Sequence, residues 1–317
     1  MKKETVLVTG GSGFLGVHTL LQLLQLGYTV RTTVRSLTKK ESVIHALQEG
    51  GITDISTLSF YEADLTSDKG WKEAISGCDY VLHVASPFPA SDPEDEMELI
   101  IPARDGALRV LKAAEQAGVK RVVLTSSFAA VGYSPKPDGH IFTEKDWTNP
   151  EDTKQAYIKS KTIAEKVAWD FIHTVGCEME LTVINPVGIF GPTLGGISSA
   201  SIDVVIKGIL NGAIKESPSF TMGVVDVRDV ADLHIKAMLA TEATGERFIV
   251  ATDEIVSFYD VAQLIKQERP SLSTSIVDMQ PTPGQFYKGI SNQKAVTVLQ
   301  WQPRGTKEAL LSSVDSL

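Results

Sequence analysis

The sequence predicts an α/β protein with a Rossmann-type, doubly wound parallel sheet and a smaller, partly interleaved C-terminal lobe. Short apolar runs alternate with helical patterns through the first half of the chain, as parallel strands alternate with the helices that connect them. A glycine-rich segment, residues 9–16, lies between the first apolar run and the first helical pattern. The chain has 317 residues, of which 43% are hydrophobic and 22% charged, and this composition is typical of a globular protein with a sizeable core.

Each predicted element of the first half follows from the spacing of its apolar residues and from the residue that ends it. Residues 5–9 form a short apolar strand, and residues 14–26 carry Leu and Val at helical spacing before Gly27, a plausible helix C-cap. By the same criteria we expect strands at 29–34, 58–61, 80–84, 121–125 and 181–185, and helices at 39–48, 71–76, 97–117 and 156–173. Residues 134–153 are polar and contain proline, which is typical of a loop.

The pattern changes after Pro186. Glycines cluster between residues 188 and 196, which indicates turns rather than another strand–helix repeat. Helical patterns at 202–210, 227–239 and 261–267 alternate with short extended runs. We therefore expect a Rossmann domain at 1–185, to which residues 225–250 return, and a smaller lobe formed by 186–224 and 251–317.

The net charge and the residue composition indicate which partners and which compartment to expect for this protein. The net charge of −9 argues against a nucleic-acid-binding or anionic-membrane surface. Cys78 and Cys177 are isolated, so we expect two buried free thiols in a reducing compartment, and the scattered histidines indicate no metal site. The first apolar run is too short for a signal peptide, and no segment reaches transmembrane length. These features predict a soluble cytoplasmic protein.

The glycine-rich segment predicts a dinucleotide site. Gly10 permits a tight turn, Gly13 allows the backbone to approach a phosphate, and Gly16 allows the helix to pack close to the sheet. The free N–H groups and the positive end of the helix would then hold the pyrophosphate. The alternative is that these glycines only shape a strand–helix turn.

The end of the second strand favours NADP. NAD-binding sites usually carry Asp or Glu there to bind the ribose hydroxyls, and residues 31–36 contain no acid. Arg35 stands at this strand end with Lys39 four residues later, and a guanidinium and an ammonium can together bind a 2′-phosphate. The alternative is that both are solvated surface cations.

Tyr157 and Lys161 form the strongest candidate for catalysis. Residues four apart share one helix face, and a neighbouring ammonium would stabilise a phenolate, whose pKa is ordinarily near 10. Ser127 follows the strand at 121–125 and could donate a hydrogen bond to a substrate carbonyl. The alternatives are that Tyr157 packs in the core, that Lys161 is solvated, and that Ser127 only shapes a turn. The sequence also leaves open that Ser126, rather than Ser127, has the catalytic role.

The chain resembles the extended short-chain dehydrogenases/reductases, most closely the dihydroflavonol-reductase-like group that includes cinnamoyl-CoA reductases and methylglyoxal-type aldehyde reductases. The motifs that carry the resemblance run nearly end to end: Thr9–Gly16, Thr33–Ser36, Ala63–Leu65, His83–Pro87, Leu124–Ser127, Tyr157–Lys166, Asn185–Pro192, Val225–Ala231 and Trp301–Pro303. The resemblance implies a catalytic triad of Ser127, Tyr157 and Lys161. It also implies that Asp64 and Leu65 face the adenine, that Ala85 and Ser86 line the path to the nicotinamide ribose, and that Pro186 and Val187 flank the nicotinamide.

The complete predicted NADP site comprises Gly10, Gly13, Phe14, Leu15, Gly16, Arg35, Lys39, Asp64, Leu65, Val84, Ala85, Ser86, Thr125, Tyr157, Lys161, Pro186 and Val187. The apolar residues Pro87, Phe88, Phe128, Val131, Tyr133 and Phe190 follow strand ends and predict a substrate with an apolar body. Asp226, Arg228 and Asp229 could belong to an active site, although an interdomain brace is the simpler interpretation.

Three functions remain open from the sequence. The first is NADPH-dependent reduction of an aldehyde or ketone, with a small carbonyl or alcohol substrate and a monomeric or homodimeric enzyme. The second is a related epimerase or isomerase, which the missing second-strand acid disfavours. The third is a redox-sensing NADP-binding module, a class that typically lacks the Tyr/Lys pair.

Overall fold

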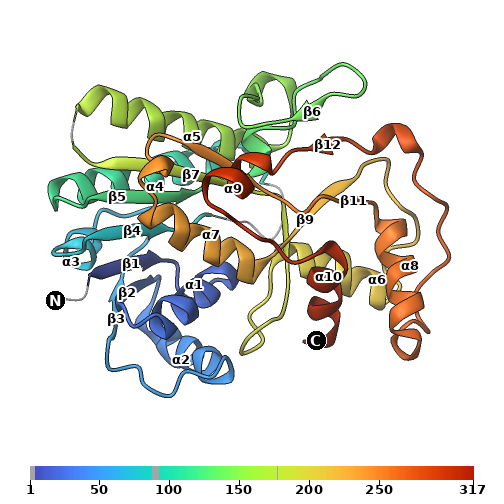
Figure 1. Ribbon diagram of the computed structural model, residues 1–317, viewed down its shortest axis with the longest axis horizontal. Helices are drawn as coiled ribbons and strands as arrows, with labels where there is room; N and C mark the ends of the chain where they lie inside the picture. Colours follow the sequence, from blue (N-terminus) through green and yellow to red (C-terminus); the bar gives the residue numbers. More distant parts are fainter. Residues whose placement is uncertain (1–3, 88–92, 177) are drawn as a thin grey trace.

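The computed structural model describes residues 4–87, 93–176 and 178–317, so Phe88 and Cys177 lie outside the described residues. Seven parallel strands form the central sheet in the order β10-β7-β5-β4-β1-β2-β3 (Figure 1). Their bounds are β1 (Thr5–Thr9), β2 (Thr29–Val34), β3 (Leu58–Glu62), β4 (Tyr80–His83), β5 (Arg121–Thr125), β7 (Glu180–Pro186) and β10 (Arg247–Val250). The predicted doubly wound α/β fold is confirmed.

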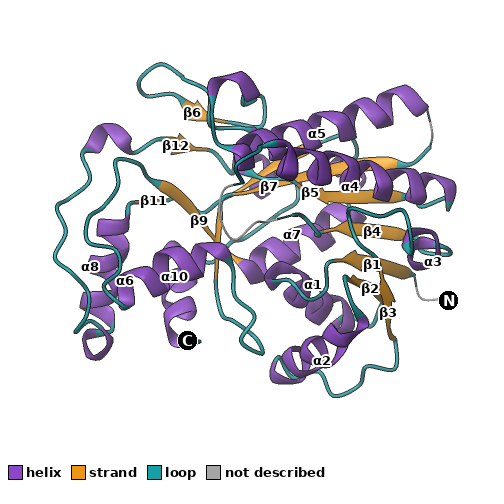
Figure 2. Ribbon diagram, turned by 180° about the vertical axis from the view of Figure 1, so that it is seen from behind, coloured by secondary structure: helices purple, strands orange, loops and turns teal. Residues whose placement is uncertain are grey.

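Helices cover both faces of this sheet (Figure 2). One layer contains α1 (Phe14–Gln25), α2 (Lys40–Glu49) and α7 (Val227–Leu239), and the other contains α3 (Trp71–Ile75), α4 (Met97–Gln116) and α5 (Ala156–Val175). Successive side chains of β1 point to opposite faces of the sheet and so reach both cores. Val6 and Val8 belong to the core beneath α1 and α7, whereas Leu7 belongs to the core beneath α3, α4 and α5.

The chain order places a crevice between β1 and β4. From β1 the chain proceeds outward to β2 and β3, and it then returns to form β4 on the other side of β1. Loops that leave β1 and β4 therefore diverge, and ligands of open α/β sheets bind in such a crevice beyond the carboxyl ends of the strands. Thr9 joins the two strand ends, because its hydroxyl accepts a hydrogen bond from the Ala85 amide at 2.9 Å and lies 2.8 Å from Nδ1 of His83.

The C-terminal lobe lies beside the sheet, where a three-stranded sheet is formed by β8 (Gly188–Phe190), β9 (Met222–Asp226) and β11 (Ile255–Val256) (Figure 1). Its helices are α6 (Lys207–Leu210), α8 (Phe258–Glu268) and α10 (Thr306–Asp315), whereas α9 (Gln293–Val298) packs against β10 of the central sheet. β6 (Ile141–Phe142) pairs with β12 (Gly289–Ile290). Short 3₁₀ segments occur at Leu37–Lys39, Phe128–Ala130, Pro150–Asp152, Thr241–Ala243, Pro270–Leu272 and Gly284–Phe286. The helix predicted at 202–210 consists of a π-helical segment, Ile202–Ile206, followed by α6.

A single core connects the lobe with the sheet. Trp301 is fully buried, belongs to the same apolar cluster as Val6, and donates its indole N–H to the carbonyl oxygen of Asp229 at 3.1 Å. Cys78 is buried, as expected. Within residues 4–87, 93–176 and 178–317, no helix combines the length and the apolar character needed to cross a membrane.

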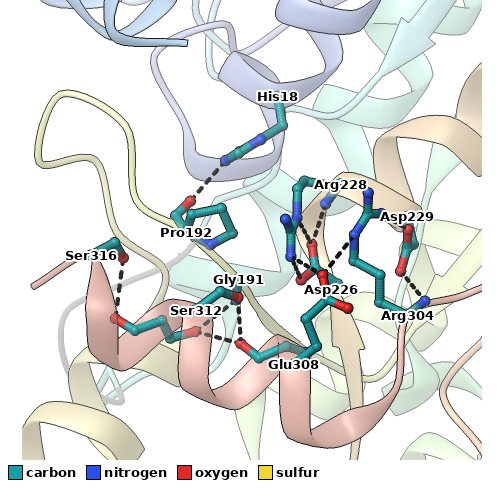
Figure 3. A network of polar contacts seen from close by, with 12 residues as sticks. His18, Gly191, Pro192, Asp226, Arg228, Asp229, Arg304, Glu308, Ser312 and Ser316 are labelled. Carbon is teal, nitrogen blue, oxygen red and sulfur yellow. Dashed lines mark hydrogen bonds and ion pairs between the residues drawn. The ribbon is translucent and has the colours of Figure 1, made fainter.

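Ion pairs join α7 to α10 and to the segment before α10 (Figure 3). Asp226 accepts hydrogen bonds from the Arg228 amide and guanidinium at 2.9 and 2.6 Å, and Arg228 also lies 3.2 Å from Glu308 of α10. Asp229 accepts a 2.6 Å hydrogen bond from the Arg304 amide and pairs with its guanidinium. This cluster links the elements as a brace, the interpretation that the sequence favoured over an active-site role.

Candidate active site

The glycine-rich loop closes as the sequence predicts, with one difference. Gly10 has φ +71°, and a Cβ atom there would lie 3.0 Å from the Cβ of Ala85. A Cβ on Gly16 would overlap the carbonyl oxygen of Gly10, so this glycine allows α1 to pack against the turn rather than against a strand. Sequence reasoning missed Gly11, where a Cβ would overlap the hydroxyl of Thr32 in β2.

The first turn of α1 fits a phosphate. Gly13 is the N-cap residue of α1, and no side chain accepts a hydrogen bond from the first N–H groups of this helix. A Cβ on Gly13 would meet only the Gly10 carbonyl oxygen, at 3.3 Å, and the space around its Cα is otherwise open to a ligand. Phe14 and Leu15 start the helix with buried side chains, so their backbone rather than their side chains would contact the cofactor.

The predicted 2′-phosphate contacts lie at the end of β2. Arg35 and Lys39 are both exposed, and neither forms an ion pair with another described residue. Arg35 is near enough to Asp64 to contribute to lowering the pKa of that carboxyl, although the hydrogen bonds from the Thr66 amide and hydroxyl are the main cause. Leu65 packs against α4, where a Cβ on Gly106 would lie 2.9 Å from the Leu65 Cβ.

Tyr157, Lys161 and Ser127 come together at the carboxyl ends of β4 and β5. Nζ of Lys161 lies 5.8 Å from the ring centroid of Tyr157 on the same face of α5, and it donates a 2.7 Å hydrogen bond to Oγ of Ser86. Oγ of Ser127 accepts a 3.1 Å hydrogen bond from the Ala129 amide and is also hydrogen-bonded to the Tyr157 side chain. Three residues predicted to be catalytic and one predicted cofactor contact therefore share one site.

The pKa of Tyr157 departs from the sequence-based expectation. Burial raises this pKa, and the hydrogen bond from Ser127 opposes the increase only in part. Burial also lowers the pKa of Lys161 to about 8, against the opposing effect of Glu165. The net shift of the Tyr157 pKa is therefore opposite to the one expected, because desolvation outweighs the stabilisation of the phenolate by its polar neighbours. The Tyr157 phenol therefore carries its proton at neutral pH and can donate it to a substrate.

The structure distinguishes the two adjacent serines. Ser126 is buried and donates a 2.5 Å hydrogen bond to Oε2 of Glu165, so its hydroxyl proton is held by that carboxylate. Ser127 carries the hydroxyl that is bonded to Tyr157. The geometry therefore favours Ser127 over Ser126 as the residue that meets a substrate.

Four other predicted contacts line the same edge of the sheet. Ala85 and Ser86 border a small cavity together with Lys161. Val84, which directly follows β4, is half-buried. Pro186 is buried at the end of β7, and the Val187 amide donates to the Val250 carbonyl at 3.2 Å. The half-buried side chain of Val187 packs against Gly223 of β9.

Thr125 uses its hydroxyl inside the protein. Nδ1 of His234 lies 2.7 Å from the Val230 carbonyl, which can only accept, so Nδ1 carries the proton and Nε2 accepts from the Thr125 hydroxyl at 2.7 Å. The Thr125 hydroxyl can therefore meet a cofactor only as a hydrogen-bond acceptor, a narrower role than the sequence indicated.

Buried neutral histidines should make stability depend on pH. Burial lowers the pKa of His234 to about 4, so the unfolded chain binds more protons and stability is lost as pH falls below about 6.5. We expect His234→Gln to remove about 2 kcal/mol of the loss in unfolding free energy between pH 7 and pH 5. Urea unfolding at several pH values measures this effect. His45→Gln, at an exposed histidine of α2, is the control, and an unchanged pH dependence in His234→Gln would contradict the assignment.

The predicted apolar contacts to substrate divide into two groups. Val131 and Phe190 are fully buried in apolar clusters, so their assignment to a substrate site was wrong: they are core residues. Phe128 packs edge-to-face with Tyr133 at 6.4 Å between centroids, and Tyr133 is half exposed and close enough to influence the pKa of Tyr157. In the described part of the chain, no group of three or more His, Cys, Asp or Glu side chains could hold a metal ion.

Comparison with known proteins agrees with this fold. The model of the NAD dependent epimerase/dehydratase family matches residues 6–251. The chain belongs to this family, that of the extended short-chain dehydrogenases/reductases, which confirms the resemblance inferred from the motifs.

Particular relatives are named as reductases. The chain is 36% identical to "Cinnamoyl-CoA reductase 1" of Arabidopsis thaliana over 99% of its length and 89% of the relative's. It is 33% identical to the "Putative NADPH-dependent methylglyoxal reductase GRP2" of Candida albicans, covering 98% of this chain and 97% of that protein. The crystal structure of yeast methylglyoxal/isovaleraldehyde reductase Gre2 complexed with NADPH superposes with a TM-score of 0.86 at 28% identity, covering 98% and 97% of the two chains.

Proposed function

We propose that the protein is an NADP-dependent oxidoreductase that reduces the carbonyl group of an aldehyde or ketone to an alcohol. The observation that carries this proposal is the meeting of Tyr157, Ser127 and Lys161 beside the dinucleotide loop, at the carboxyl edge of the sheet. The reductase names of its relatives and the NADPH complexes among similar structures support the same conclusion.

The cofactor site suits a phosphorylated dinucleotide. The uncapped start of α1 would hold the pyrophosphate, and Arg35 and Lys39 would bind the 2′-phosphate. Ser86 and Lys161 would hold the nicotinamide ribose, and Asp64 and Leu65 would face the adenine. NADPH supplies a hydride to the carbonyl carbon when it is bound.

The residues of the chain handle the proton and the developing charge. As the carbonyl carbon is reduced, negative charge builds on its oxygen, and the hydroxyl groups of Ser127 and Tyr157 are both placed to donate hydrogen bonds there. Tyr157, whose phenol is protonated at neutral pH, then transfers its proton to the oxygen. The ammonium of Lys161, held by Ser86, stabilises the phenolate that remains.

The alternatives find less support. A UDP-glucose 4-epimerase of Thermotoga maritima has a TM-score of 0.77 but only 21% identity, and this likeness extends to the fold alone. The end of β2 lacks the acid expected of an NAD-dependent epimerase. A redox-sensing module would not need Tyr157 and Lys161 on one helix face beside Ser127.

The substrate should carry an apolar body next to its carbonyl group. Phe128 and Tyr133 offer ring surface beside Tyr157, and Pro87 borders the same edge. We expect NADPH oxidation with aromatic and branched aliphatic aldehydes and ketones, with kcat/KM at least about tenfold above that for small polar aldehydes of similar reactivity. Loss of the reduced-nicotinamide absorbance across such a panel measures this. Turnover confined to charged sugar nucleotides would contradict the proposal.

A further inference from the structure

Glu165 is a fully buried carboxylate for which the reaction outlined above has no role. It lies on α5 one helical turn after Lys161 and two turns after Tyr157, so the three side chains share one face. Its side chain has 0% exposure. A buried charge is costly unless it is paired and hydrogen-bonded, so the contacts that hold it there indicate its use.

Both carboxylate oxygens are occupied. Oε2 accepts hydrogen bonds from Ser126 Oγ at 2.5 Å and from Asn185 Nδ2 at 2.7 Å. Oε1 accepts from Arg247 Nε at 2.5 Å, and the indole N–H of Trp169 adds a longer contact at 3.4 Å. These donors come from α5, from the ends of β5 and β7, and from β10, so one carboxylate ties a helix to three strands.

Two of these donors flank Ser127. Ser126 is its neighbour in the chain, and Asn185 Nδ2 also donates to the carbonyl oxygen of Ser127 at 3.1 Å. Asn185 immediately precedes Pro186 and Val187, the residues expected to flank the nicotinamide. The carboxylate therefore fixes the backbone on both sides of the Ser127 hydroxyl.

Arg247 anchors the carboxylate from the far side. Its guanidinium lies 3.7 Å from the ring centroid of Trp147 and donates to the carbonyl oxygens of Glu144 and Asp146 at 2.8 and 3.0 Å. With the guanidinium held in this way, Glu165 has little freedom to change rotamer. The pair is rigid as well as buried.

Among the described residues, Glu165 is the carboxylate whose charge acts on Lys161. Glu165, Lys161, Ser86, Ser126 and His83 border one small cavity. The titratable groups around Lys161 in the described chain are Tyr157 and Glu165 on α5 and His83 on β4, and burial keeps His83 neutral by lowering its pKa to about 3. Of these groups only Glu165 is a carboxyl group, and it opposes the loss of the Lys161 proton.

We propose that Glu165, anchored by Arg247, is a positioning residue of the active site that fixes Ser127 through Ser126 and Asn185 and keeps Lys161 in its charged form. This inference rests on the proposed function, since it concerns the same three catalytic residues. It extends the site by a second layer of buried polar groups that come from β5, β7 and β10.

Glu165→Gln tests the role of the charge, because glutamine has nearly the same shape. Lys161 should lose its proton at lower pH in this variant, and a neutral Lys161 cannot stabilise the Tyr157 phenolate. We therefore expect the alkaline fall in kcat for carbonyl reduction to move to lower pH by about one unit. On the alkaline side of this fall kcat should be about tenfold below wild type, with the Kd for NADPH at pH 6 within about threefold of wild type.

Glu180→Gln is the matched control. Glu180 stands at the start of β7 and pairs with the buried guanidinium of Arg121 at 2.6 Å, but it does not contact Ser126, Asn185 or Lys161. Both variants lose one carboxylate from a partly or fully buried ion pair, so both should lower Tm. Only Glu165→Gln should move the pH profile.

The outcomes separate the two proposals. Wild-type activity combined with an unmoved pH profile in Glu165→Gln would overturn this inference and leave the proposed function intact. A wild-type protein without carbonyl reductase activity would overturn both. If Glu165→Gln does not fold, Ser126→Ala replaces it: we expect kcat about fivefold lower with unchanged NADPH affinity, and an unchanged kcat would overturn the inference.

Discussion

Replacing Tyr157 with phenylalanine should lower kcat for carbonyl reduction by at least about 10²-fold while leaving NADPH affinity within a few-fold. The substitution removes one hydroxyl and little volume. Its effect should fall on the chemical step, because Ser127 can donate a hydrogen bond to the carbonyl oxygen but cannot readily protonate it. Steady-state kinetics together with NADPH titration of the purified variant measure the two quantities separately.

Lys161→Ala is the informative companion to Tyr157→Phe. It should reduce both kcat and NADPH affinity, since Lys161 is expected to contact the ribose as well as to stabilise the phenolate. Near-normal turnover by Tyr157→Phe would remove Tyr157 from the mechanism and restore the redox-sensing interpretation. Equal effects of the two variants on cofactor binding would show instead that Tyr157 mainly holds the cofactor.

Most strands of the central sheet were predictable because they are buried apolar runs with a clear end in the sequence. The predicted strands at 5–9, 29–34 and 121–125 coincide with β1, β2 and β5. Each is a run of apolar or β-branched residues of the kind that a parallel sheet buries on both faces. Because these strands are parallel, the loops after them lie at the same, carboxyl edge of the sheet. The strand order therefore predicted that the candidate active site lies at this edge.

The C-terminal lobe was less predictable. α10 begins after Gly305 without a capping side chain, so the sequence offers no start signal there. Apolar periodicity predicted a helix at 202–210. It cannot distinguish an α-helical hydrogen bond from the π-helical one that the Lys207 amide donates to the Ile202 carbonyl oxygen. β8, β9 and β11 are short and depend on pairing with one another, which is information that local sequence does not contain.

Within the site, local motifs were informative and long-range contacts were not. The four-residue spacing of Tyr157 and Lys161 and the glycine spacing can be recognised along the chain. The bond between Glu165 and Arg247 joins residues 82 positions apart, and nothing in the sequence pairs them. The pKa of Tyr157 was mispredicted for the same reason, since its burial depends on elements that only the fold brings together.

Replacing Arg35 with alanine should weaken NADPH binding by at least about tenfold and leave NADH binding nearly unchanged. A charge-assisted hydrogen bond to a phosphate contributes about 1.5–3 kcal/mol, and only NADPH carries the 2′-phosphate. Arg35 is exposed and forms no ion pair with the other described residues, so its removal should cost little folding stability. Fluorescence titration with each cofactor measures the two affinities.

The control for Arg35→Ala is Lys266→Ala, which removes one positive charge from α8, far from β2 in Figure 1. If Arg35 acts through the net charge of the protein, both variants should weaken NADPH binding equally, and the loss should disappear at high salt. If it binds the 2′-phosphate directly, only Arg35→Ala should lose the preference for NADPH. Equal loss of NADPH and NADH affinity in Arg35→Ala would contradict the assignment, because a contact to the 2′-phosphate can act on only one of the two cofactors.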